Sequence, residues 1–233
     1  MNLSLPLSLP LSLPLSLATA ALVAAFMVAP PPASANEAAP VALAGEVTGR
    51  LDPDPAARYY PFPATMSERA GQRLRLRDVE RLLKRYPDHP SLLRERAYIR
   101  AKRGEIDAAE ADFARALQVA GGDTFLRRHV LWSQGWARFD AGRDEAALQS
   151  WKEAVDLHGG NPFWWPYTAA LAKWRQGRRE EAIALYDQGV AGMPQYGTER
   201  GFAERTAHWP ASQFEVASAV FTAWRASKRA TQP

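Results

Sequence analysis

The sequence contains no cysteine and only four histidines among its 233 residues. Without cysteine there can be no disulfide, thiolate metal site, cysteine nucleophile or lipid anchor on a cysteine. No two of the histidines stand at the spacing of a zinc site. A phosphate-binding glycine loop and a nucleophile elbow are also missing. The sequence therefore predicts a non-enzymatic protein with no catalytic residues, no metal and no cofactor. The histidines are His89, His129, His158 and His208.

Charged side chains are missing from the first 35 residues. A low-complexity Leu-Ser-Leu-Pro tract leads into an apolar stretch over 18–28, and Ala33-Ser34-Ala35 fits the small-x-small pattern of a signal cleavage site. We expect residues 1–35 to be a secretory signal peptide cleaved after Ala35, which makes the protein periplasmic or secreted. Because no basic residue precedes the apolar stretch, the alternative is a misassigned start codon in front of a cytoplasmic protein.

Positive charge is unevenly distributed after this segment. Residues 36–64 are rich in alanine and proline and predict an extended leader. Residues 67–104 then carry twelve Lys or Arg against five Asp or Glu, which is +7, so the rest of the chain sums to −3. The simpler interpretation is a solvated helix face with local ion pairs. The alternative is a patch for peripheral contact with an anionic membrane or another acidic surface. Nucleic acid is not expected as a partner, because few aromatics are interleaved.

One block of sequence occurs three times, with Gly104, Gly142 and Gly177 at equivalent positions. Five, nine and twelve residues after each glycine come a small residue, an aromatic and a second small residue, all on one helical face. Recurrence of this face every 38 and then 35 residues predicts a stacked array of helix pairs, which presents a surface rather than enclosing a reaction. The three sets are Ala109, Phe113 and Ala116; Ala147, Trp151 and Ala154; and Ala182, Tyr186 and Gly189.

These blocks resemble the tetratricopeptide repeat family, whose helix-turn-helix unit has alanine, an aromatic and proline at set positions. The resemblance covers about residues 67–196 and implies an all-α helix-turn-helix repeat solenoid. Its expected parts are a capping helix over 65–89, repeats over 90–123, 124–161 and 162–196, and degenerate capping helices over 197–233.

Local patterns add detail to these helices. Asp107 and Glu110 fit a capping box for the second helix of the first repeat. Asp123 is a ready N-cap for the helix that follows. In the last helix we expect one face, made by Phe214, Ala217, Phe221 and Trp224, to cover the end of the array.

The first helices of the three units depart from the family pattern in the same way. Where the family has an aromatic, this chain has Arg100, Arg138 and Lys173, and the bulky side chains move to a neighbouring stripe. In the family's frame that stripe faces the concave groove where peptides bind, whereas a one-residue rotation of the helices makes it core. The basic residues flank the groove or cap helix carbonyls. The candidate groove residues are Tyr98, Arg100, Trp132, Trp136, Arg138, Phe139, Tyr167 and Trp174.

Two functions are compatible with these patterns. The resemblance implies a scaffold that binds a protein or peptide partner in its concave face, and the signal-like segment over residues 1–35 predicts that it is exported. All eight tryptophans lie between Trp132 and Trp224, more than a core of this size needs. The alternative is therefore a module that binds an envelope glycan or small ligand on exposed indole rings. The exposure of Trp132, Trp136 and Trp174 distinguishes groove from core.

Overall fold

The structure is a computed structural model that describes residues 75–230. The expected signal peptide and leader lie outside the described residues. No helix within residues 75–230 is long and apolar enough to cross a membrane. The elements are α2 (Leu76–Arg85), α3 (Pro90–Lys102), α4 (Ile106–Ala120), α5 (Thr124–Asp140), α6 (Asp144–His158), α7 (Trp164–Arg175), α8 (Arg179–Gly192), the 3-10 helix η2 (Pro194–Gly197), α9 (Glu199–Thr206) and α10 (Ala211–Ala230).

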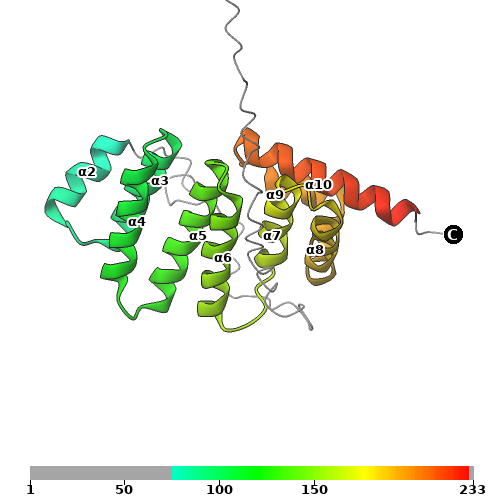
Figure 1. Cartoon of the computed structure of the whole chain (residues 1–233), viewed down its shortest axis with the longest axis horizontal. Coiled ribbons are helices and arrows are strands. Elements are labelled where there is room, and N and C mark those ends of the chain that lie inside the picture. Colours follow the sequence, from blue (N-terminus) through cyan, green and yellow to red (C-terminus); the bar gives the residue numbers. More distant parts are fainter. Residues whose placement is uncertain (1–74, 231–233) are drawn as a thin grey trace, which may run out of the picture. The chain divides into compact units, whose positions relative to one another are not determined.

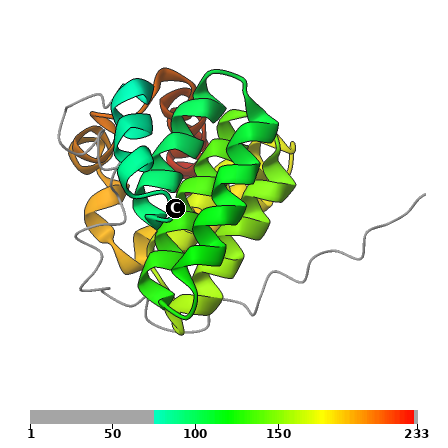
Figure 2. The same cartoon turned by 90° about the vertical axis from the view of Figure 1, so that its left-hand side faces the viewer.

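Three helix pairs, α3/α4, α5/α6 and α7/α8, form the repeats (Figure 1). Contacts between α3 and α5, α4 and α5, and α6 and α7 join each pair to the next, and Figure 2 shows this packing from the α2 end. The recurring glycines Gly104, Gly142 and Gly177 have φ between +76° and +80°, a left-handed conformation that suits glycine and allows the tight turn inside each pair. The predicted all-α repeat solenoid is confirmed.

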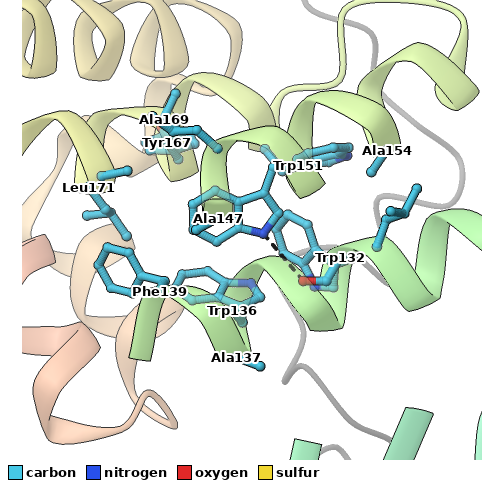
Figure 3. Packing of buried hydrophobic residues seen from close by; sticks show 14 of the residues in the cluster. Trp132, Trp136, Ala137, Phe139, Ala147, Trp151, Ala154, Tyr167, Ala169 and Leu171 are labelled. Carbon is cyan, nitrogen blue, oxygen red and sulfur yellow. Dashed lines mark hydrogen bonds between the residues drawn. The ribbon is translucent and has the colours of Figure 1, made fainter. Parts of the chain in front are cut away.

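The second-helix stripe faces the core as its spacing predicts. Phe113, Trp151 and Tyr186 are all buried. Trp151 has no exposed surface, and the rings of Trp132, Trp136 and Phe139 lie around it with centroids 5.1–6.3 Å away (Figure 3). Its indole Nε1 donates a hydrogen bond to the carbonyl oxygen of Trp132 at 3.3 Å. Aromatic rings therefore form the centre of the seam between α5 and α6.

One of the two predicted caps forms. The carboxylate of Asp123 accepts a hydrogen bond from the backbone N–H of Leu126 at 2.9 Å and caps α5. The capping box of Asp107 and Glu110 is wrong. Helix α4 begins at Ile106 after Glu105, with no side-chain cap, so Asp107 already lies within its first turn. Glu110 is instead held by side chains of α5.

The C-terminal helices fold back over the array. Helix α10 packs against α7 and α8. At the turn before α10, the ring of Trp209 meets that of Trp136 at 5.5 Å. The amide Nε2 of Gln213 donates to both carboxylate oxygens of Asp140, at 2.9 and 3.1 Å. The tail therefore reaches past the third unit to the C-terminal end of α5.

The face that α10 turns inward differs from the predicted one at its first residue. Ala217, Phe221 and Trp224 are buried as expected, but Phe214 is 43% exposed. Gln213 takes the inward place at this end because its amide reaches Asp140. An aromatic side chain is thereby left on the outer surface of α10.

Candidate functional site

Most of the predicted groove aromatics lie in the core. Tyr98, Trp132, Trp136, Phe139 and Tyr167 are all buried, so these five side chains do not line an exposed groove. The sequence left open whether these five side chains line a groove or belong to the core, and the structure shows that they belong to the core. Aromatic rings from other elements pack on this cluster. Trp151 of α6 and Trp209, before α10, contact Trp136, and Tyr186 of α8 contacts Tyr167. The sixth candidate aromatic, Trp174, is half-buried, with the guanidinium of Arg179 stacked 3.7 Å above its ring centroid.

Two of the three recurring basic residues of the first helices, Arg100 and Arg138, pair with acids on second helices. Arg100 Nη1 donates to Asp112 Oδ2 at 2.9 Å, and Arg96 binds the same carboxylate through two hydrogen bonds. Lys173 is buried, and its pKa is lowered by burial and by the charge of Arg178. Arg100 and Arg138 therefore neither flank an aromatic groove nor cap their own helices.

Arg138 lies at the centre of a polar network that joins two repeats. Its Nε and Nη2 donate to Glu110 Oε1 and Oε2 at 2.8 and 2.9 Å, a bidentate pair between α5 and α4. Gln134 Nε2 also donates to Glu110, at 2.8 Å, and Arg138 Nη1 donates to Ser150 Oγ on α6 at 2.8 Å. Because the network links three helices of two units, its role is to fix how the repeats stack.

The network predicts a large effect of Arg138→Ala on stability. The free energy of unfolding is expected to fall by about 2 kcal/mol at neutral pH, because the half-buried Glu110 carboxylate loses its bidentate partner. Urea unfolding followed by circular dichroism measures it. The matched control is Arg115→Ala, which breaks the exposed pair with Asp88 and is expected to cost less than about 1 kcal/mol. Equal costs for the two variants would contradict a structural role of the network.

The same network makes stability depend on pH. Burial raises the pKa of Glu110, but hydrogen bonds from Arg138 and Gln134 and the charge of Arg138 outweigh it, so the pKa lies below its ordinary value of 4.5. The contribution of the ionised Glu110 to the free energy of unfolding is thus fully present above pH 4.5. It is lost as the pH falls through the lower pKa that Glu110 has in the folded protein. Acid unfolding of Arg138→Ala should show a smaller loss of stability over this range than the wild type.

The aromatic stripe of α5 reaches the surface at its N-terminal end. Phe125, His129, Trp132 and Trp136 follow one another at spacings of four, three and four residues. Exposure rises along them from 5% at Trp136 and 6% at Trp132, through an intermediate value at His129, to 48% at Phe125. The stripe is therefore buried at the predicted residues Trp132 and Trp136 and becomes accessible only at Phe125, which was not among the predicted groove residues.

We call the accessible end the α5 entry surface, made of Phe125, Arg128, His129 and His158. The rings of Phe125 and His129 lie 4.4 Å apart. Arg128 Nη1 lies 2.6 Å from Nδ1 of His158 at the end of α6. A second arginine, Arg94 on α3, contacts His129, and its Nη1 lies 3.5 Å from Nδ1 of that histidine. The N-terminal half of α5 thus carries an exposed aromatic, an imidazole in contact with α3 and a guanidinium in contact with α6.

This surface combines the side chains that dominate protein interfaces, an aromatic and an arginine. It also suits carboxylates, because guanidinium groups bind them through charge-assisted hydrogen bonds. Within residues 75–230, no three His, Asp or Glu side chains are placed to hold a metal ion. The arrangement is suited to binding. The histidine positions alone gave no sign of it, but the helical spacing of Phe125, His129 and Trp132 could have revealed it.

Comparison with known proteins agrees with the repeat architecture. Residues 66–129 match the family described as tetratricopeptide repeat. The match includes α2, α3, α4 and the first residues of α5, and so ends within the α5 entry surface. No curated protein and no solved structure matches the chain. The family match supports a tetratricopeptide repeat region over residues 66–129, and the three stacked helix pairs have the helix-turn-helix arrangement of such repeats.

Proposed function

We propose that the protein is an exported, non-catalytic scaffold that binds an extended segment of a partner protein at the α5 entry surface. Tetratricopeptide repeat domains generally bind protein partners. Export is supported by the uncharged first 35 residues and by Ala33-Ser34-Ala35, which fits a cleavage site. The scaffold role is supported by the network around Arg138, because its charged side chains hold neighbouring repeats together.

One observation carries the choice of surface. Phe125 is a large apolar side chain left 48% exposed on a first helix, at the uncovered end of the aromatic stripe. Exposed aromatics beside arginine are typical of the residues that contribute most to binding. Arg128 and His158 beside it favour a partner segment with acidic residues.

The glycan alternative has less support. It requires indole faces that a sugar ring can reach, and Trp132, Trp136, Trp164 and Trp165 are buried. The half-buried Trp174 has one ring face occupied by Arg179. A peptide-binding role needs only the one exposed aromatic and its basic neighbours.

The proposal predicts that Arg128→Glu weakens partner binding at least about tenfold, because a close charge pair at an interface becomes a repulsion. The purified protein is used to capture partners from an extract of the cell envelope, and the dissociation constant of the purified partner is then measured by calorimetry. Lys152→Glu is the matched control, since it makes the same charge change on α6, where Lys152 pairs with Asp156. It should change binding less than about twofold.

Two results would count against the proposal. One is an envelope extract from which the wild type retains no specific protein. The other is a partner whose affinity responds equally to Arg128→Glu and Lys152→Glu. The export part is tested separately by N-terminal sequencing of the recovered protein, for which Asn36 is the expected first residue.

A further inference from the structure

The outer face of α10 is apolar and uncovered within the described part of the chain. A shallow groove of about 560 Å³ runs along it between Phe214 and Ala226, and all of its lining residues belong to α10. Most of them are small, and Phe214 is 43% exposed at one end. The last helix of a repeat array normally carries a polar outer face, because nothing packs on it. This helix departs from that rule along several turns.

The charged residues of α10 fall into two groups, those that form ion pairs with other described residues of the chain and those that do not. Arg225 and Lys228 point back to their own chain, where Arg225 pairs with Glu199 and Lys228 pairs with Asp187. Glu215 and Arg229 are exposed, and neither forms an ion pair within residues 75–230. They are fourteen residues apart. At 1.5 Å per residue this is about 21 Å along the helix, so they cannot pair with each other in one chain.

Their positions on the helix are symmetric. Glu215 lies seven residues before Thr222 and Arg229 lies seven residues after it. Seven residues are close to two helical turns, so all three side chains lie on one stripe of the outer face. A second α10 placed antiparallel, with its Thr222 opposite the first, brings each Glu215 next to the Arg229 of the other copy. The same patch then serves both copies, as in a two-fold interface.

We propose that the outer face of α10 binds a second copy of this chain, in an antiparallel helix pair centred on Thr222. Small side chains between the charged ends, Ser218 and Ala226 among them, let the two helix backbones approach closely. Two Glu215–Arg229 pairs set the antiparallel direction and the register. A single helix pair buries less surface than a standard stable interface, so the dimer is expected to dissociate in the micromolar range. It does not involve the α5 entry surface.

A charge-reversal experiment tests the inference on the full chain by sedimentation equilibrium. The wild type is expected to show a monomer–dimer equilibrium. E215R and R229E each place like charges opposite one another in their own dimer, and each is expected to weaken it at least about tenfold. An equimolar mixture of the two variants pairs opposite charges at both ends again. This mixture, and the double variant E215R/R229E, should recover dimerisation to within about threefold of the wild type.

Several outcomes would overturn the inference. A wild type that stays monomeric at the highest attainable concentration rules out the dimer. A dimer that is indifferent to both reversals, or a mixture that fails to associate while each variant keeps wild-type circular dichroism, rules out the antiparallel α10 pairing. K152E, on α6, is the matched control and should dimerise as the wild type does. Partner binding at the α5 entry surface is measured separately, so failure of one proposal is distinguishable from failure of the other.

Discussion

Replacing Trp151 with alanine is expected to lower the free energy of unfolding by about 4 kcal/mol, within the range measured for buried tryptophan and phenylalanine. The indole of Trp151 has no exposed surface and is enclosed by Trp132, Trp136 and Phe139. Its removal leaves a cavity and takes the indole donor from the carbonyl of Trp132. The change is measured by urea unfolding followed by far-ultraviolet circular dichroism.

The cavity cannot collapse easily, because its walls are held from outside. Trp136 is packed against Trp209 of the tail at 5.5 Å, and Phe139 lies under the guanidinium of Arg175 at 4.3 Å. The control is Trp174→Ala, which removes a half-buried tryptophan at the surface and should cost less than half as much. A cost below about 1 kcal/mol for Trp151→Ala would show that the seam between α5 and α6 is not packed as described.

Gly135→Ala is expected to destabilise the protein although alanine is the better helix former. An added Cβ at position 135 would lie 2.7 Å from Cε2 of Trp151 and closer still to its Nε1 and Cδ1. Alanine gains about 1 kcal/mol in helix propensity over glycine. Overpacking a rigid core costs about 3 kcal/mol or more at its upper end. Because Trp151 has no room to move, we expect a net loss of about 2 kcal/mol in the free energy of unfolding.

Two comparisons isolate the clash as the cause. Gly122→Ala adds a Cβ with no atom within 4 Å and should change stability by less than about 0.5 kcal/mol. In G135A/W151A the ring that the new methyl group would meet is absent. The double variant should therefore be clearly more stable than the sum of the two single effects predicts. Strict additivity would contradict direct contact between these two residues.

Trp151→Ala and Gly135→Ala both alter the packing of α5, the helix that carries most of the α5 entry surface. The same helix carries the packed seam at Gly135 and the α5 entry surface at Phe125, so a change in the seam is expected to displace the residues of that surface as well. Arg138 joins this helix to α4 and α6. The position of the entry surface thus depends on a core that the surface residues do not themselves form.

Much of the fold follows from local patterns. The spacing of Ala147, Trp151 and Ala154 and of the two equivalent sets specifies which face of each second helix is buried, because 3.6 residues per turn place them on one side. The recurring glycines mark turns that need positive φ, and Asp123 caps the helix that it precedes. Signals of this kind act over a few residues and can be recognised without knowing what lies beyond the helix.

The candidate site depended on contacts between distant segments. Periodicity placed Trp132, Trp136 and Phe139 on one stripe but could not tell what covers it. Gln213 binds Asp140 from 73 positions away, and Trp209 packs against Trp136 across a similar separation in sequence. Glu110 fitted a capping box locally, yet a bidentate pair with Arg138, 28 residues on, holds its carboxylate in the fold.

By itself, then, the sequence determined an all-α array of stacked helix pairs and the inward face of its second helices. Local backbone geometry and helical periodicity suffice for both. Only the tertiary structure decided that the aromatic first-helix stripe is core at Trp136 and surface at Phe125, and that Phe214 lies outside. The reason is that burial is a property of pairs of surfaces. A helix face becomes core only when another segment packs on it, and here that segment is a tail whose partners lie far away in the chain.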